Sequence, residues 1–192
     1  MLDQFQNLPK LENCNVAIIG LGYVGLPLAI EIAKSRKAIV ENSSDNMVIG
    51  FDINVERIKY LKSKFNIENY NNHNSDIQFT NDIVDLCKAD IYIIAVPTPI
   101  DNAKRPDFNA LKNACVTIAN AIKTRKKSKT KNKTYTDPIV VFESTVYPGA
   151  TEEVCIPIIE ENSNLLSNKN GGFFYGYSPE RINPGDNDHQ LT

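Results

Sequence analysis

The sequence lacks a hydrophobic run long enough to cross a membrane. No stretch approaches the ~20 apolar residues that a spanning helix requires. The first thirteen residues contain Asp3 and Glu12 and no apolar segment typical of a secretion signal. We therefore expect a cytoplasmic protein without a membrane partner, in which residues 1–13 form an N-terminal extension.

Cysteine patterns that mark metal sites or disulfide scaffolds are also missing. Cys14, Cys87, Cys115 and Cys155 are scattered, without CxxC spacing and without a nearby histidine. This spacing argues against a bound metal and against a disulfide framework. We expect the four side chains to be small buried thiols.

Neither sign of charge dominates, because 21 Lys and Arg against 23 Asp and Glu give a formal net charge of −2. A whole-molecule field that would attract nucleic acid is therefore excluded. Residues 123–137 (KTRKKSKTKNKTYTD) do carry seven basic side chains, which leaves nucleic-acid binding open as an alternative. Tyr135 is the only aromatic residue there, so a solvated loop without a nucleic-acid partner is favoured.

Short apolar strands alternate with helical patterns along the whole chain. The strands are expected over residues 15–19, 47–51, 76–80, 91–96, 139–142 and 173–177. The helices are expected over residues 23–34, 54–64, 81–88, 109–123 and 151–161, with Asn81 as the cap of the third. Residues 35–46, 67–75 and 123–137 have the composition of inserted polar loops. The alternation predicts an α/β domain over residues 14–192, with a mostly parallel sheet and helices on both faces.

A glycine motif lies directly between the first strand and the first helix. Gly20-Leu21-Gly22-Tyr23-Val24-Gly25 matches GxGxxG, which is a weak signal alone but an informative one at this position. Gly20 would make the tight turn, Gly22 would let the backbone approach a pyrophosphate, and Gly25 would allow close packing of helix on strand. With Tyr23 and Val24, these residues predict the phosphate loop of a doubly wound Rossmann fold at a helix N-terminus.

Asp52 follows the second strand, where a carboxylate can accept hydrogen bonds from the adenosine ribose hydroxyls. It lies 32 positions after Gly20, against the usual ~20, and the polar segment 35–46 accounts for the excess. A carboxylate there would repel the 2′-phosphate of NADP, so NAD is the expected cofactor. Ile53 and Arg57 would lie beside the cofactor, and the charge of Arg57 could soften the preference for NAD.

Five motifs in order resemble the UDP-glucose/GDP-mannose dehydrogenase family. They are GLGYVGLPLA at 20–29, GFDIN at 50–54 followed by Arg57, AVPTP at 95–99, ESTVYPGATEE at 143–153 and YSPERINPGD at 177–186. The PERINPG form is similar to enzymes that act on UDP-N-acetylhexosamines, including the UDP-N-acetylglucosamine dehydrogenases of the Vi-antigen type. UDP-glucose enzymes tend to carry a second Glu where Pro184 stands.

The strand ends of these motifs supply further candidate cofactor contacts. Val96, Pro97 and Thr98 follow the fourth strand and would line the nicotinamide side of the crevice. Ser144 and Thr145 follow the fifth strand and offer hydroxyl groups to the cofactor or to a water molecule. The resemblance implies that Thr145 also assists catalysis.

The last motif carries the candidate substrate contacts. The resemblance implies that Glu180 is catalytic, orienting a water molecule or acting as a base where cofactor and sugar meet. Arg181 and Asn183 would face the nucleotide sugar with it. Without the motif, a Glu-Arg pair in a loop would be read as solvated.

Members of this family oxidise the sugar C6 alcohol twice with two NAD, through an aldehyde and a cysteine-bound thioester, to a uronic acid. The nucleophilic cysteine and the oxyanion-stabilising group belong to a second domain. None of the four cysteines here stands in the GGxC context of that nucleophile, since Phe173 follows Gly171-Gly172. We therefore expect the NAD-binding half of a UDP-N-acetylhexosamine 6-dehydrogenase of surface-polysaccharide synthesis, ending before its central helix and sugar domain.

Three alternatives remain open beside this interpretation. The enzyme could act on UDP-glucose or GDP-mannose, and the chain could instead be a dinucleotide-binding module without chemistry. The full-length protein is expected to be a homodimer with a UDP-sugar as substrate.

Overall fold

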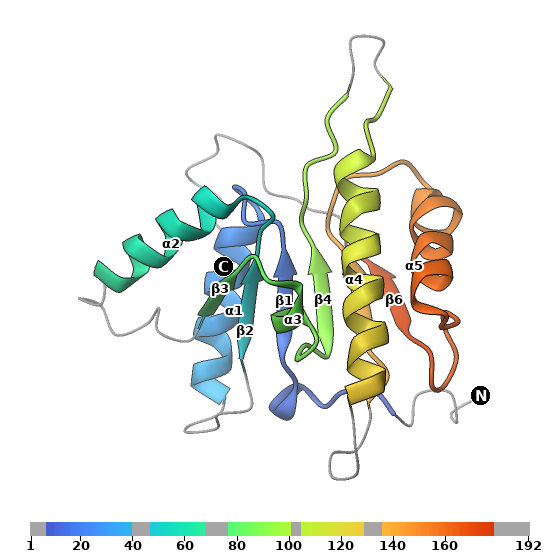
Figure 1. The fold of residues 1–192 in the computed structure, drawn as a ribbon, viewed down its shortest axis with the longest axis horizontal. Coiled ribbons are helices and arrows are strands. Elements are labelled where there is room, and N and C mark those ends of the chain that lie inside the picture. Colours follow the sequence, from blue (N-terminus) through green and yellow to red (C-terminus); the bar gives the residue numbers. More distant parts are fainter. Residues whose placement is uncertain (1–6, 40–46, 68–76, 101–104, 129–135, 179–192) are drawn as a thin grey trace.

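The computed structural model describes residues 7–39, 47–67, 77–100, 105–128 and 136–178 (Figure 1). In these ranges a single six-stranded sheet has the order β3-β2-β1-β4-β5-β6, and all neighbouring strands are parallel. The strands are β1 (Val16–Ile19), β2 (Val48–Phe51), β3 (Ile77–Thr80), β4 (Ile91–Ile94), β5 (Ile139–Phe142) and β6 (Phe174–Tyr177). The helices are α1 (Gly25–Ile39), α2 (Val55–Ile67), α3 (Ile83–Leu86), α4 (Asn109–Ser128) and α5 (Ile156–Ser163), with the short turns η2 (Leu11–Asn13) and η3 (Thr151–Cys155). The expected doubly wound Rossmann fold is confirmed.

Strand order reverses at β1, which pairs with β2 on one side and with β4 on the other. The last residues of β1, β2 and β4 are aligned, because Ile19 lies opposite both Phe51 and Ile94. All carboxyl ends therefore meet at one edge. The gap between the loops that follow β1 and β4 is the switch point where open α/β sheets bind ligands.

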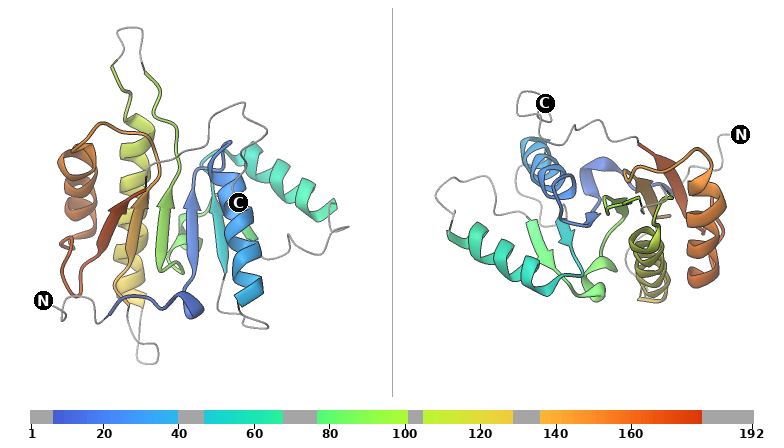
Figure 2. Two further views of the ribbon diagram at one scale, coloured as in Figure 1. Left: turned by 180° about the vertical axis from the view of Figure 1, so that it is seen from behind. Right: turned by 90° about the horizontal axis from the view of Figure 1, so that it is seen from above.

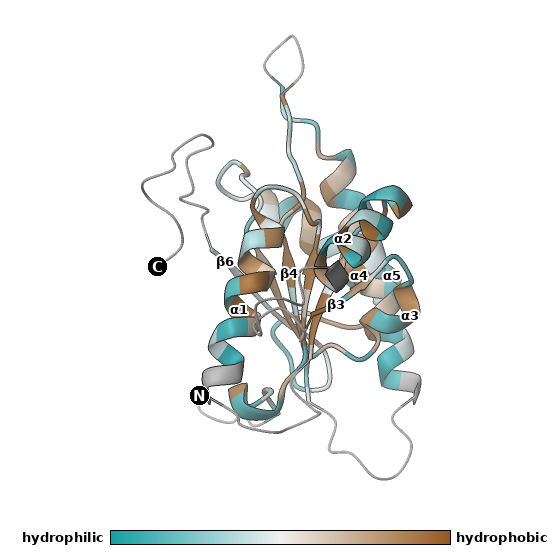
Figure 3. Cartoon of the chain, turned by 90° about the vertical axis from the view of Figure 1, so that its left-hand side faces the viewer, coloured by the Kyte–Doolittle hydropathy of each residue, from teal (hydrophilic) through white to brown (hydrophobic). Residues whose placement is uncertain are grey.

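The two faces of the sheet bury alternate residues of each strand. Ala17 and Ile19 of β1 face a core completed by α3, α4 and α5, whereas Val16 and Ile18 face a core completed by α1 and α2. In Figure 1, α3 and α4 lie in front of the sheet, and α1 lies in front when the molecule is seen from behind (Figure 2). Apolar residues are concentrated in the strands, and polar residues are concentrated on the outward sides of the helices (Figure 3). The helices therefore shield the apolar side chains of the strands.

The expected loop 35–46 is partly wrong, since α1 continues to Ile39. A tertiary contact accounts for the longer helix: the Arg36 guanidinium donates to the backbone carbonyl of Cys14. Only residues 40–46 of the expected loop fall outside the helix, and they lie outside the described residues.

The expected basic loop is also partly wrong, since α4 continues to Ser128. Arg125 is only 2% exposed and forms an ion pair with Asp90. Lys123 Nζ donates to the Asn162 carbonyl at 3.1 Å, and Lys126 Nζ donates to the Gly171 carbonyl at 2.7 Å. These basic side chains hold α4 to neighbouring elements and are not a free cationic surface.

Two local expectations are corrected as well. The cap of α3 is Asp82 rather than Asn81, because the Asp82 carboxylate accepts the Val84 N–H at 2.9 Å. The helix expected over residues 151–161 begins with the wide π turn η3 before α5.

The expected burial of the thiols holds for Cys14, Cys115 and Cys155, and Cys87 is partly exposed. In the described ranges, three or more His, Cys, Asp or Glu side chains nowhere gather in a way that could hold a metal ion. No helix in the same ranges has both the length and the apolar character needed to cross a membrane.

Candidate functional site

The turn from β1 to α1 requires glycine at two positions for reasons internal to the protein. Gly20 has φ +94°, and a Cβ there would lie 2.8 Å from the Ala95 carbonyl oxygen. A Cβ on Gly25 would lie 1.9 Å from the Gly20 carbonyl oxygen. The Gly20 N–H donates to the Phe51 carbonyl at 2.9 Å, so the turn continues the hydrogen bonding of the sheet. These two glycines let α1 start directly above the end of β1.

Gly22 differs from both, because a Cβ on it would meet no atom within 4 Å. Packing inside the protein therefore gives no reason for glycine here. The residue is exposed and lines a pocket together with Tyr23 and Val24, at the N-terminus of the fifteen-residue helix α1. An open backbone at a helix N-terminus can receive a pyrophosphate, whose charge the helix dipole and free N–H groups stabilise. The loop thus fits a dinucleotide.

Asp52 follows β2 and lies against this loop. Its Oδ2 accepts the Leu21 N–H at 2.9 Å, and its Oδ1 accepts the Asn54 N–H at 2.9 Å. Each carboxylate oxygen has further acceptor capacity, which suits ribose hydroxyls. The neighbouring Ile53 side chain is 78% exposed and adds an apolar surface beside the carboxylate.

Arg57 lies in the first turn of α2 and faces the same loop. Its Nε and Nη2 donate to the Leu21 carbonyl at 3.1 and 2.9 Å. The guanidinium is therefore directed at the protein backbone, and the expectation that it softens the exclusion of NADP gains no support from its position.

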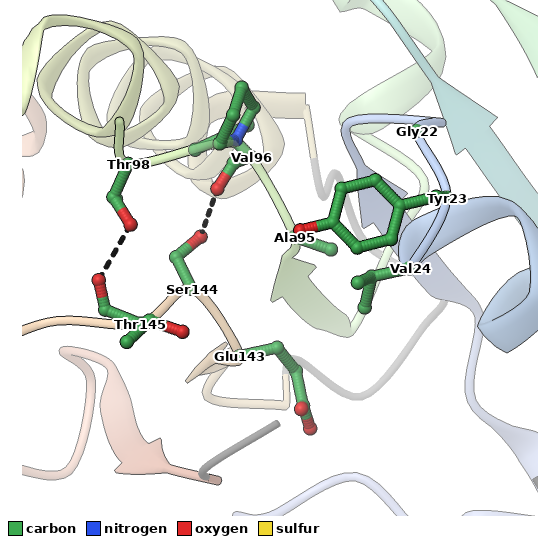
Figure 4. Close-up of a pocket in the computed structure, with 10 residues that line it drawn as sticks. Gly22, Tyr23, Val24, Ala95, Val96, Thr98, Glu143, Ser144 and Thr145 are labelled. Carbon is green, nitrogen blue, oxygen red and sulfur yellow. Dashed lines mark hydrogen bonds between the residues drawn. The ribbon is translucent and has the colours of Figure 1, made fainter. Parts of the chain in front are cut away.

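Across the switch point, the pocket continues over the ends of β4 and β5. Its volume is about 280 Å³. Figure 4 shows Tyr23 and Val24 on one side of the pocket and Thr98, Ser144 and Thr145 on the other. The remaining lining residues include Ala95 and Val96, which follow β4, and Glu143, which follows β5. Loops from three parallel strands thus enclose one crevice.

Two hydroxyl groups tie the far wall together. Ser144 Oγ donates to the Val96 carbonyl at 2.7 Å, and Thr98 Oγ1 donates to the Thr145 carbonyl at 2.6 Å (Figure 4). Ser144 is only 5% exposed, and the hydrogen of its hydroxyl is used within the wall. The Thr145 side chain is exposed and can meet one.

Most of the expected site residues come together. One pocket is lined by Gly22, Tyr23, Val24, Val96, Pro97, Thr98, Ser144 and Thr145. Gly20 and Gly25 shape the turn, while Asp52, Ile53 and Arg57 flank the loop on the β2 side. Glu180, Arg181 and Asn183 lie outside the described residues.

The sequence-based set missed Ala95 and Glu143, which also line the pocket. Both follow a strand directly, as Gly20 and Asp52 do. Applying the strand-end rule to β4 and β5 as strictly as to β1 and β2 would have found them.

Comparison with known proteins places the chain among nucleotide-sugar dehydrogenases. The model of the UDP-glucose/GDP-mannose dehydrogenase family, NAD binding domain, matches residues 14–192. Protein CapL of Staphylococcus aureus is 46% identical over 181 residues, which cover 92% of this chain and 37% of CapL. UDP-N-acetyl-D-glucosamine 6-dehydrogenase of Pseudomonas aeruginosa is 42% identical over 187 residues, covering 95% of this chain and 39% of that enzyme. The chain thus spans well under half the length of these relatives.

Solved structures of nucleotide-sugar dehydrogenases are also similar to this chain. A ternary complex of GDP-mannose dehydrogenase from Pseudomonas aeruginosa superposes with a TM-score of 0.68 and 25% identity, over 88% of this chain and 36% of that one. UDP-D-ManNAc dehydrogenase from Pyrococcus horikoshii gives a TM-score of 0.65 and 28% identity, over 89% and 37%. With its glycine loop, its strand-end carboxylate and its crevice at the switch point, the chain belongs to the UDP-glucose/GDP-mannose dehydrogenase family and matches the NAD-binding domain of that family.

Proposed function

We propose that the whole protein oxidises a UDP-N-acetylhexosamine at C6 to the uronic acid with two NAD, for surface-polysaccharide synthesis, and that this chain is its NAD-binding half. The choice of sugar rests on the difference in sequence identity between two groups of relatives. UDP-N-acetyl-D-glucosamine 6-dehydrogenases of Pseudomonas aeruginosa and Salmonella typhi are each 42% identical to the chain. UDP-N-acetyl-D-mannosamine dehydrogenase of Pyrococcus horikoshii is 29% identical.

The residues of the pocket would hold NAD along the sheet edge. The backbone at Gly22, Tyr23 and Val24 would receive the pyrophosphate, and Asp52 would accept from the adenosine ribose, with Ile53 beside it. Val96 to Thr98 and the Ser144–Thr145 segment would enclose the nicotinamide end. NAD bound there supplies the hydride acceptor, while the protein supplies orientation and exclusion of water.

The remaining roles rest on the family resemblance. We propose that Thr145 assists catalysis from the pocket wall and that Glu180 acts at the junction of cofactor and sugar. Arg181 and Asn183 would bind the nucleotide sugar, and a nucleophilic cysteine outside residues 1–192 would carry the thioester. The single domain over residues 14–192, the homodimeric whole protein and the cytoplasmic location remain predictions of the same kind.

Two experiments test the proposal separately. Titration of this chain with NAD and NADP in a calorimeter is expected to show binding that prefers NAD. NADH formation by a protein that also contains the remaining domains is then measured with UDP-N-acetylglucosamine, UDP-N-acetylgalactosamine, UDP-glucose and GDP-mannose.

We expect turnover with an N-acetylated sugar and none by this chain alone. Strong activity on UDP-glucose alone would overturn the choice of sugar but leave NAD binding intact. Absence of NAD binding by the chain would contradict the cofactor site itself. Turnover by the isolated chain would show that the missing nucleophile is not required.

A further inference from the structure

Two cysteines meet in the core between α4 and η3. Cys115 lies on the buried side of α4, and Cys155 is the last residue of η3. Both side chains are 0% exposed, belong to the same core cluster and are joined by a hydrogen bond between their thiols. The other two cysteines lie apart from them, since Cys14 belongs to the core on the opposite face of the sheet and Cys87 is partly exposed. Cys115 and Cys155 therefore form a buried dithiol.

The hydrogen bond makes the two thiols unequal. It lowers the pKa of Cys155, which accepts it, and Lys112 acts in the same direction, against burial and the charge of Glu152. The same bond and burial raise the pKa of Cys115, which donates it. Since the thiolate is the reactive form of cysteine, Cys155 is the nucleophile of the pair and Cys115 is the thiol that reacts second.

The dithiol lies on the two elements that continue the far wall of the pocket. The wall segment after β4 leads into α4, and the wall segment after β5 leads into η3. Within the wall, Thr98 Oγ1 donates to the Thr145 carbonyl at 2.6 Å. Phe108, directly before α4, faces the Tyr147 ring with the ring centres 5.6 Å apart. A change in the distance between α4 and η3 is therefore passed to the wall.

The turn that carries Cys155 is irregular. The Ile156 N–H donates to the Thr151 carbonyl across the wide π turn, and such turns are rare and frequently mark functional sites. Local opening of a turn exposes buried groups for short times without unfolding the domain. A small oxidant can reach the Cys155 thiol in this way.

We propose that Cys115 and Cys155 are a redox pair that a peroxide converts to a disulfide between α4 and η3, and that this bond disturbs the far wall of the pocket and weakens the binding of the nicotinamide end of NAD. The effect on binding goes beyond the NAD-binding role stated above but rests on it. The formation of the disulfide does not depend on that role.

The reaction balances with one molecule of hydrogen peroxide. The Cys155 thiolate attacks one peroxide oxygen, the O–O bond breaks, and the sulfur becomes a sulfenic acid. The Cys115 sulfur then attacks the sulfenic sulfur, so that the S–S bond forms, the S–O bond breaks and the oxygen leaves as water. The dithiol loses two electrons and two protons, and the peroxide takes up both and is reduced to water.

The test uses this chain alone, because the whole protein is proposed to carry a further nucleophilic cysteine that would also react. The wild type, Cys115→Ala, Cys155→Ala and Cys87→Ala are treated with hydrogen peroxide and afterwards with dithiothreitol. Peptide mapping without reduction detects the cross-link, and calorimetry gives the Kd of NAD and of ADP-ribose at each stage. Cys87→Ala is the matched control, because it removes a partly exposed thiol whose pKa is raised by burial.

We expect the Cys115–Cys155 cross-link in the wild type and in Cys87→Ala, and in neither of the other variants. In the cross-linked proteins the Kd of NAD should rise by about tenfold, as for the loss of one or two hydrogen bonds. Dithiothreitol should restore the original Kd. ADP-ribose, which lacks the nicotinamide, should bind with an unchanged Kd throughout.

A wild type that forms no such cross-link would overturn the proposal. A cross-link that leaves the Kd of NAD unchanged, or that weakens NAD and ADP-ribose equally, would overturn the effect on the nicotinamide end. If the reduced wild type bound no NAD, the cofactor assignment would fail, but the peptide map would still decide whether the redox pair exists. Should one of the two alanine variants not fold, the other removes the same bond and carries the comparison.

Discussion

Two glycines of the phosphate loop, Gly22 and Gly25, should respond differently to alanine. A Cβ on Gly25 would lie 1.9 Å from the Gly20 carbonyl oxygen, whereas a Cβ on Gly22 would meet nothing within 4 Å. Gly25→Ala should therefore damage the fold, and Gly22→Ala should damage only NAD binding.

The clash at Gly25 sets the size of the first effect. Real Cβ atoms essentially never approach another heavy atom closer than 3.0 Å, so α1 or the end of β1 has to move by more than an ångström. Overpacking of this kind costs about 1–3 kcal/mol. In a domain of this size, Tm should fall by about 3–10 °C.

Gly22→Ala should change the free energy of unfolding by no more than about 0.5 kcal/mol, as for an exposed position without contacts. Its methyl group would stand where the pyrophosphate has to approach the backbone. NAD at a hundred times its Kd should stabilise the wild type by about 2.7 kcal/mol, which raises Tm by roughly 5–10 °C. Most of that rise should be lost in the variant.

Thermal unfolding with and without NAD measures both effects at once. Gly176→Ala is the matched control, because a Cβ on Gly176 also meets nothing within 4 Å and the residue lies in β6, outside the pocket lining. The control should keep both Tm and the rise with NAD. A stable Gly22→Ala protein that keeps the full NAD-dependent rise would refute the assignment of this loop to the pyrophosphate.

Three further substitutions test other parts of the site and fold. Asp52→Asn keeps an acceptor for the loop but removes the charge, so calorimetric titration should show the NADP-to-NAD ratio of Kd falling by about tenfold. Ser144→Ala leaves the Val96 carbonyl without its donor at 2.7 Å, and urea unfolding should show a loss of about 1–2 kcal/mol; an unchanged midpoint would contradict this role. Burial raises the pKa of Asp85, but hydrogen bonds from Lys88 and Thr80 outweigh it and hold the pKa below its ordinary 3.8. That stabilisation is present above pH 4 and lost as pH falls through the lowered pKa, so the Tm difference between wild type and Asp85→Asn should narrow on acidification.

Apolar runs that alternate with helical patterns were sufficient to predict the six strands and a mostly parallel sheet, because a strand buried on both faces has an unbroken apolar sequence. The ends of α1 and α4 were not predictable in the same way. Both helices extend through polar residues that a sequence pattern assigns to solvent. Arg36 and Arg125 instead reach backbone or carboxylate partners far along the chain, and such tertiary contacts leave no periodic signal.

The site shows the same division. Residues that act through the backbone geometry of the turn, Gly20 and Gly25, were predictable because a missing side chain has few explanations. Residues whose role depends on which group their side chain hydrogen-bonds were not predictable from the sequence. Ser144 was expected to offer its hydroxyl to a ligand, yet the hydroxyl donates to Val96. Arg57 was expected to soften the preference for NAD, yet its guanidinium donates to the Leu21 carbonyl. A side chain with several donors has several candidate acceptors, and only the fold chooses among them.

The long interval between Gly20 and Asp52 shows why spacing rules tolerate insertions at one edge of a parallel sheet. The extra residues belong to the longer helix α1, which continues to Ile39, and to the connection from there to Met47, directly before β2. That connection joins the amino end of β2, whereas the site uses the carboxyl ends. Since Ile19 still lies opposite Phe51, Asp52 reaches Leu21 at 2.9 Å despite the longer chain. The loops at the carboxyl edge face the crevice, so their length decides which backbone groups reach it. A dinucleotide site is therefore better recognised by the register of its strands than by the number of residues between its motifs.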